Sequence, residues 1–446
     1  MSAAKVSHGV TKTRREDSAS VRTSVVPSLN DELTHKIPRI RFKKWNDGWC
    51  KLAFTNIATI RRGLTYSPID CSSSGIRVLR SSNIDEDMFR LFQDDVFVKS
   101  DAVNIPSVKD KDILITAANG SSHLVGKHAL VRTDGNGEMV HGGFMLLATS
   151  KEAAFLNASM CTPWYREFIE SNMMGGNGAL GNLPKKAFDE LQLIAPVSVA
   201  ERDYIGTCFE TLNVLISVRQ SALAKLQALK KSMLLNMFPQ GDAKVPKIRF
   251  RGFVGVWEGV RLGDEGHTYN GLSGKTSADF GHGAGKYVTY MNVFINPISK
   301  EGQCESVEID KRQNEVRPGD VFFTTSSETP DEVGMSSVWL SSGKNTYLNS
   351  FCFGYRPHRE IDSKFLAYLL RSMSFREKVV KLAQGISRFN ISKGKVMDIH
   401  ILMPEKEEQV KIGEYFYSLD RLIAARRDEI EQLKHMKAAL LNRMFV

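Results

Sequence analysis

Three short segments combine residue types that could bind phosphate or cut a phosphodiester. Gly274-Lys275-Thr276 ends like a phosphate-binding loop, but Tyr269 stands where that loop needs its first glycine. Pro330-Asp331 together with Asp362-Ser363-Lys364 resembles the residues of a metal-dependent nuclease, although Asp362 is also placed to cap a following helix. The ten histidines form no HxxxH pair and the six cysteines no CxxC pair. We therefore predict a chain with no catalytic centre, metal or cofactor of its own.

Composition limits the classes of protein that remain. The 446 residues are 42% hydrophobic, which is enough to fill the cores of about three domains. The net charge of +10 allows a polyanionic partner without requiring one. Mean hydropathy is −0.24 and the sequence holds no long apolar run, so we expect a cytoplasmic protein without a membrane partner.

The chain repeats itself at an offset of 207 to 208 residues. The matching blocks are 38–42 with 246–250, 111–116 with 319–324, and 230–238 with 437–445. A period this long predicts two tandem globular units, each followed by a helix. Residues 1–36 lie outside the repeat and are rich in Ser, Thr and charge, so we expect a disordered N-terminal extension.

Both helical segments carry the apolar pattern of a coiled-coil seam. Steps of four and three residues link Ile205, Phe209, Leu212, Ile216, Leu223, Leu226, Met233 and Met237 in the first, and Ile412, Phe416, Leu419, Ile423, Ile430, Leu433, Leu440 and Met444 in the second. Ser198-x-x-Glu201 has the form of a capping box at the start of the first helix. Two matching seams in one chain favour pairing with each other over packing on separate domains.

Cations within the seams indicate the direction of pairing. A parallel pair would set Arg219 against Arg426 and Lys230 against Lys437, at about 1–3 kcal/mol of repulsion each. An antiparallel pair places each cation near an apolar residue, such as Ile430 for Arg219. We therefore predict an antiparallel intramolecular coiled coil related by a pseudo-twofold axis, with a seam of about 48 Å.

Between the helices the sequence alternates short β-rich runs with Gly/Ser/Asn loops and a few helices. This pattern predicts an α+β class with two tandem mixed domains, separated by the two long helices. The predicted ranges are 37–195 and 245–403 for the domains, and 196–244 and 404–446 for the helical segments.

The motifs of residues 37–446 together resemble a known family. They are IPRIRF with Trp49, KIRF with Trp257, YNGLSGKT with YVTYMNVF, the segment 319–324, Pro404 with Glu408-Gln409, and the endings LLNMF and LLNRMF. The chain resembles the specificity subunits of type I restriction–modification systems (the HsdS family). The resemblance implies two target-recognition domains alternating with two helical spacers, without a catalytic site.

The same resemblance implies partners. It predicts double-stranded DNA with a split, asymmetric site, two methyltransferase subunits and restriction subunits that complete the nuclease. S-adenosylmethionine, ATP and Mg²⁺ would be used by those partners. A helical spacer of about 48 Å would set half-site centres about 10–15 base pairs apart.

Polar loops that leave the predicted strands are the candidates for base contacts. They are Arg80, Ser81, Asn83, Asn119, Ser121, Ser122 and His123 in the first unit, and Tyr290, Asn292, Thr325, Ser326 and Ser327 in the second. Lys185, Lys186, Arg388 and Lys393, beside glycine-rich stretches, are candidates for phosphate contacts. Two alternatives remain: a coiled-coil adaptor that binds proteins, and a nuclease in the second unit that would depend on Lys364.

Overall fold

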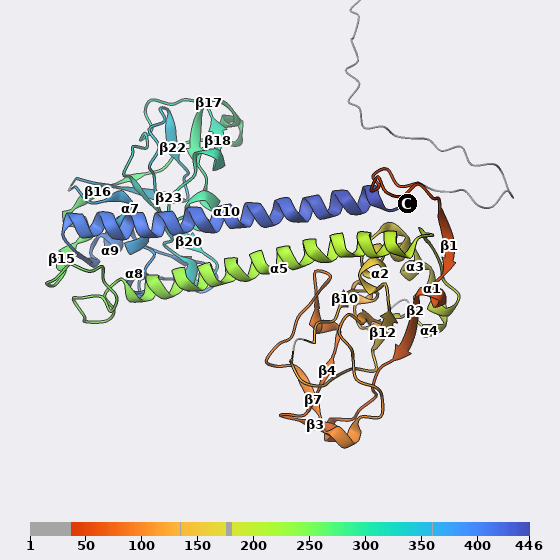
Figure 1. The fold of residues 1–446 in the computed structure, drawn as a ribbon. Coiled ribbons are helices and arrows are strands. Elements are labelled where there is room, and N and C mark those ends of the chain that lie inside the picture. Colours follow the sequence, from red (N-terminus) through yellow and green to blue (C-terminus); the bar gives the residue numbers. More distant parts are fainter. Residues whose placement is uncertain (1–36, 134, 175–180, 359) are drawn as a thin grey trace, which may run out of the picture. The chain divides into compact units, whose positions relative to one another are not determined.

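The computed structural model describes residues 37–133, 135–174, 181–358 and 360–446. The expected N-terminal extension, residues 1–36, lies outside them. The chain forms two compact units: unit 1 ends at Leu215 and also includes Leu433–Val446, and unit 2 is Ile216–Gln432. Helices α5 (Val199–Asn236) and α10 (Lys406–Met444) each contribute residues to both units (Figure 1).

Unit 1 is built on two four-stranded sheets. The first has the order β10 (His128–Leu130), β8 (Ile113–Thr116), β12 (Met145–Ser150), β2 (Ala58–Arg62), and the second the order β11 (Met139–His141), β4 (Ile76–Leu79), β7 (Val96–Val98), β3 (Cys71–Ser72). Three short pairs are β1 (Trp49–Ala53) with β14 (Gln192–Pro196), β9 (Ala118–Asn119) with β13 (Gly181–Asn182), and β5 (Ile84–Asp85) with β6 (Met88–Phe89). The short helices are α1 (Phe54–Ile57), α2 (Ala153–Ser159), α3 (Pro163–Asn172) and α4 (Lys185–Asp189).

Unit 2 repeats the strand order of the first sheet, and its second sheet repeats three of the four strands of the other. Its larger sheets are β21 (Ser336–Val338), β19 (Val321–Thr324), β23 (Cys352–Pro357), β16 (Gly266–Asn270), and β22 (Thr346–Leu348), β17 (Phe280–Val288), β18 (Cys304–Val307). The short pairs are β15 (Glu258–Arg261) with β25 (His400–Met403) and β20 (Ser326–Ser327) with β24 (Phe389–Asn390), and the short helices are α6 (Tyr290–Ile295), α7 (Ser363–Leu369), α8 (Met373–Val380) and α9 (Lys393–Met397). The predicted duplicated α+β architecture is confirmed.

A buried aspartate explains one of the repeated blocks. Asp320 accepts a hydrogen bond from the backbone N–H of Arg317 (2.8 Å) and is held by the guanidinium of Arg356 (2.7 Å). Asp112 does the same in unit 1 with Lys109 (2.9 Å) and Arg61 (3.0 Å). The carboxylate thus closes the turn that leads into the fully buried central strand, β19 or β8.

A second repeated block clamps the start of each long helix. Arg41 holds both carboxylate oxygens of Glu201 at 2.6 and 2.7 Å, and Arg249 holds those of Glu408 at 2.7 Å. Neither glutamate is exposed. The predicted capping box is therefore half wrong: the Ser198 hydroxyl does accept from the Glu201 N–H (3.4 Å), but the Glu201 carboxylate binds a distant arginine.

The long helices run antiparallel in unit 2, as predicted. In unit 2, Lys230 pairs with Asp420 (2.5 Å) and Arg219 with Glu429 (2.8 Å), so the numbering rises along one helix as it falls along the other. In unit 1 the ring of Phe445 lies 5.7 Å from that of Phe209. Lys230 and Arg219 thus form ion pairs across the seam, whereas only packing along apolar neighbours was expected.

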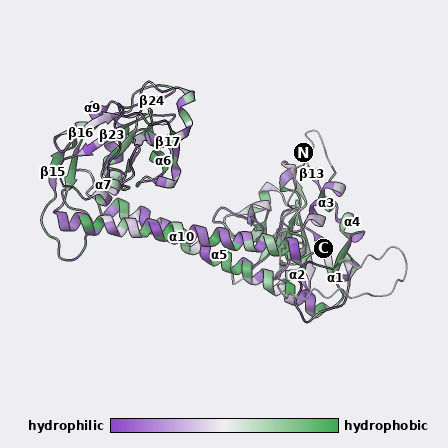
Figure 2. Cartoon of the chain, turned by 90° about the horizontal axis from the view of Figure 1, so that it is seen from above, coloured by the Kyte–Doolittle hydropathy of each residue, from purple (hydrophilic) through white to green (hydrophobic). Residues whose placement is uncertain are grey.

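The predicted seam residues are all buried or half-buried. Hydrophobic and hydrophilic residues are interspersed along both long helices (Figure 2). Each globular core also receives the end of one helix: Met237 and Phe238 join the core of unit 2, and Met444 and Phe445 that of unit 1. The last turn of α10 therefore belongs to the core of the first unit in the sequence.

Candidate nucleic-acid interface

In unit 1, three loops that leave the sheets are joined by hydrogen bonds. The Thr116 hydroxyl at the end of β8 donates to the hydroxyl of Ser81, which follows β4 (3.2 Å). The Phe144 carbonyl accepts from the backbone N–H groups of Ala117 (2.9 Å) and Ala118 (3.0 Å). These bonds bring Arg80, Ser81 and Asn119 close to the turn that carries Phe144. Ser121, Ser122 and His123, next along the chain, are exposed.

Unit 2 assembles the corresponding loops in the same way. The Tyr290 hydroxyl donates to the carbonyl of Ser326 (2.8 Å), and the Phe351 carbonyl accepts from the N–H (3.1 Å) and the hydroxyl (2.9 Å) of Thr325. Tyr290, Thr325 and Ser326 are half-buried. The structure thus gathers predicted contact residues from separate parts of the sequence into one cluster per unit.

Three of the predicted base contacts have buried side chains that bond within the chain. Asn83 is 0% exposed, and its amide donates to the Arg90 carbonyl (3.0 Å) and to Asp95 (2.8 Å). Asn292 is 1% exposed, and its amide group bonds the Lys300 backbone on both sides. Ser327 is also buried. Its hydroxyl lies 3.2 Å from Glu332. All three support loop structure.

The predicted phosphate contacts differ in how free their charges are. Lys185 pairs with Asp189 (3.1 Å) and Lys186 with Glu190 (3.3 Å), each one turn along α4. Lys393 stands at the matching start of α9, and its ammonium binds the side-chain oxygen of Asn270, which is uncharged. Arg388 is exposed, just before β24. Of these four residues, the two in unit 2 therefore have charges that are less compensated by neighbouring carboxylates.

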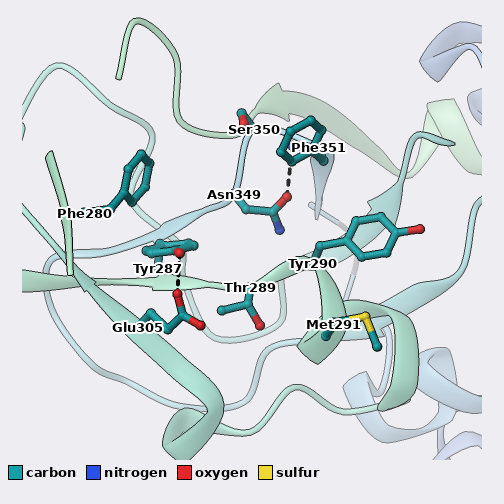
Figure 3. Close-up of a pocket in the computed structure, with 9 residues that line it drawn as sticks. All are labelled: Phe280, Tyr287, Thr289, Tyr290, Met291, Glu305, Asn349, Ser350 and Phe351. Carbon is teal, nitrogen blue, oxygen red and sulfur yellow. Dashed lines mark hydrogen bonds between the residues drawn. The ribbon is translucent and has the colours of Figure 1, made fainter. Parts of the chain in front are cut away.

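Sequence reasoning missed an aromatic residue in each unit. Phe144 is 66% exposed and Phe351 is 61% exposed, and the two occupy matching turns before β12 and β23. Phe351 also borders an open pocket of about 410 Å³, together with Tyr290 and Met291 (Figure 3). The two residues are 207 positions apart, so comparing the two copies of the repeat could have identified them.

Residues of the rejected catalytic motifs have structural partners. The Asp362 carboxylate caps α7 by accepting from the Phe365 N–H (2.7 Å), as predicted, and Lys364 pairs with Glu414. Lys275 pairs with Asp279 and Asp310, each at 3.3 Å. Within the described ranges, no three His, Cys, Asp or Glu side chains are grouped to hold a metal ion.

Comparison with known proteins finds one family to which this chain is similar. Residues 257–435 match the family described as the type I restriction modification DNA specificity domain. The MjaVIII type I restriction enzyme specificity subunit of Methanocaldococcus jannaschii is 36% identical over 305 residues, which cover 62% of this chain and 65% of that subunit. The StySPI specificity subunit of Salmonella potsdam is 22% identical over 395 residues, covering 83% and 81% of the two chains. This chain is therefore similar to type I specificity subunits, and its residues 257–435 match their DNA specificity domain.

A solved structure has a similar fold. The crystal structure of the type I restriction–modification S subunit from M. genitalium matches with a TM-score of 0.55 at 12% identity, covering 92% of this chain and 99% of that one. At such low identity the match concerns the fold alone. None of the described helices is both long and apolar enough to cross a membrane.

A buried histidine lies three residues before Phe144 in the sequence. His141 ends β11, is 0% exposed, and its Nε2 lies 3.3 Å from the Arg61 carbonyl. Its Nδ1 has no hydrogen-bond partner. Burial lowers the pKa of His141 from 6.5 to about 4, because the charged imidazolium would lose its hydration.

We predict that unit 1 loses stability as the pH falls from 6.5 towards 4. In this pH window the unfolded chain binds a proton at His141 and the folded chain does not. The free energy of unfolding therefore decreases as the pH is lowered, by on the order of 3 kcal/mol in total. His128, also buried with a lowered pKa, adds to the loss. In urea titrations at several pH values, His141→Gln should show a shallower pH dependence than wild type. The exposed His123→Gln control should not, and equal slopes for all three proteins would contradict the assignment.

Proposed function

We propose that this chain is the non-catalytic DNA sequence-recognition subunit of a type I restriction–modification complex. Domains 37–195 and 245–403 would each read one half of a bipartite, asymmetric site, and segments 196–244 and 404–446 would act as helical spacers. The observation that carries the proposal is the cluster of hydrogen-bonding side chains with nearby cations in each unit, at matching loops of a duplicated fold. Major-groove reading needs such donors and acceptors on a rigid scaffold.

Differences between the two clusters support an asymmetric site. Arg80 and Ser81 follow β4 in unit 1, whereas Thr289 and Tyr290 follow β17, the matching strand of unit 2. Ser81 offers a short hydroxyl where Tyr290 offers an aromatic ring. Two units that present different side chains at the same loop would read different bases.

Partners follow from the family rather than from any site on this chain. We propose that two methyltransferase subunits and the restriction subunits bind it in the cytoplasm, and that S-adenosylmethionine, ATP and Mg²⁺ act on those subunits. In the nuclease-like motif, Asp362 caps α7 and Lys364 pairs with Glu414, which supports a chain without its own chemistry. Half-site centres about 10–15 base pairs apart remain the expectation from helix length.

Comparing the adenine methylomes of cells with and without the gene tests the proposal. The expected result is the loss of one two-part motif, whose halves and spacing name the target. The full chain with its methyltransferase should then bind that duplex in a salt-dependent way and discriminate against a scrambled duplex. No lost motif and no DNA binding would favour a protein-binding adaptor instead.

We predict that Lys393→Ala weakens binding to all DNA sequences alike. Removing one phosphate contact should make the slope of log K against log salt less steep by about 0.9. Lys185→Ala should have a smaller effect, because Asp189 already compensates that charge. Lys247→Ala, an exposed lysine before the Arg249 clamp, is the matched control. A change in target preference, rather than in overall affinity, would assign Lys393 to base reading.

A further inference from the structure

Phe144 and Phe351 present an exposed ring from a fixed backbone. The carbonyl of Phe144 accepts two backbone hydrogen bonds, from Ala117 and Ala118. The Phe351 backbone is held on both sides, because its carbonyl accepts from Thr325 and its N–H donates to the side-chain oxygen of Asn349 (2.9 Å; Figure 3). The rings themselves are 66% and 61% exposed. Their apolar surface thus contributes little to the core, while the turn fixes their position.

Both rings lie among the polar residues of the candidate interface. The turn of Phe144 joins the loops of Ser81 and Asn119 through the hydrogen bonds of Thr116 and Ala118. Phe351 adjoins Thr325, and Ser350 lines a second open pocket with Thr325, Asn270 and Lys393. A single exposed phenylalanine is common on protein surfaces and does not indicate a function. The same residue at the same turn of two units whose reading loops otherwise differ indicates a shared task.

The methyl group of thymine is a ligand that these two rings could contact. The C5-methyl of thymine is the apolar group that base pairs present in the major groove, and a phenylalanine side chain is a known partner for it. Hydrogen-bonding side chains cannot read a methyl group, and Phe351, Tyr290 and Met291 offer an apolar pocket wall beside hydrogen-bonding neighbours.

We propose that Phe144 and Phe351 are specificity-determining residues, each packing against the C5-methyl of a thymine in the half-site read by its own unit. The inference rests on the proposed DNA-reading function and deepens it. It predicts that each half-site contains a thymine whose methyl group contributes to recognition.

Deoxyuridine substitution tests the contact, because it removes the methyl group and keeps every hydrogen-bonding atom. Using the full chain with its methyltransferase and the methylome-derived duplex, each thymine is replaced in turn and affinity is measured for wild type and Phe351→Ala. We expect one position in one half-site where the substitution weakens wild type about 3- to 10-fold. The same substitution should leave Phe351→Ala unaffected. Phe144→Ala should show the same coupling in the other half-site.

Controls separate the contact from folding and from general DNA binding. Phe351→Leu should keep part of the coupling, and the exposed Val254→Ala in unit 2 and Ile69→Ala in unit 1 should keep all of it. Affinity for scrambled DNA and its salt dependence should not change in Phe351→Ala. The inference is overturned if no thymine couples to either phenylalanine while wild type binds specifically. If wild type itself shows no sequence-specific binding, the proposed function fails instead.

Discussion

Replacing Phe238 with alanine is expected to destabilise unit 2 by about 3–5 kcal/mol. The side chain is 0% exposed, and its ring lies 5.8 Å from Phe416, 5.9 Å from Phe365 and 6.2 Å from Trp257. Because these neighbours come from three separate segments of the chain, the core cannot close over the cavity without moving all of them. Native-state hydrogen exchange, resolved by peptide, would report the free energy of opening for unit 2 separately from that of unit 1.

A matched pair of variants makes this result specific. Phe445→Ala should destabilise unit 1, because Phe445 packs on Trp49 (5.9 Å), Phe155 (5.8 Å) and Phe209 (5.7 Å). Leu235→Ala, at a 44% exposed position near the end of α5, should change the opening free energy by less than about 0.5 kcal/mol. Equal effects of Phe238→Ala and Leu235→Ala would show that the helix end does not contribute to the core.

Replacing Glu408 with alanine is expected to destabilise unit 2 by about 3–5 kcal/mol as well, through a different mechanism. Glu408 is fully buried, and its removal leaves the mostly buried guanidinium of Arg249 without a counter-charge. The remaining Arg249 donors bond the carbonyls of Gly255 (2.7 Å) and Val254 (3.2 Å), so the guanidinium stays anchored next to the cavity. The same hydrogen-exchange measurement checks the loss.

A double variant distinguishes a lost ion pair from a lost helix start. Arg249→Met with Glu408→Leu removes both charges and should recover much of the stability, because the pair is costly to desolvate and a packed apolar pair is not. If the double variant is as unstable as Glu408→Ala, the glutamate acts by its position in the helix and not through Arg249. The same comparison of single and double variants can be made for Arg41 and Glu201 in unit 1.

Local pattern was sufficient for the architecture. The heptad steps identify the seam because a helix brings residues three and four apart onto one face. The internal repeat predicts two units because both copies preserve the same core positions. Lys230 pairs with Asp420 and Arg219 with Glu429, as an antiparallel alignment requires. The sequence favours this alignment because a parallel one would bring like charges together.

Single side chains in loops could not be assigned in this way. Asn83 and Asn292 look like surface polar residues in the sequence, yet each closes a buried loop whose partners are chosen by the surrounding structure. Lys185 forms an ion pair with Asp189, four positions along the chain, which compensates its charge. Loop burial depends on contacts that no short window of sequence records.

The sequence by itself determined the duplication, the two long helices, their antiparallel seam and the α+β class, because each follows from periodicity or from comparing the chain with itself. Only the tertiary structure decided that Arg41 pairs with Glu201, that Phe445 completes the first core, and that Phe144 and Phe351 stay in solvent. The first two of these outcomes depend on contacts between residues more than a hundred positions apart. Whether a side chain is buried or ion-paired depends on which residues folding places next to it. The order of residues along the chain does not show those neighbours.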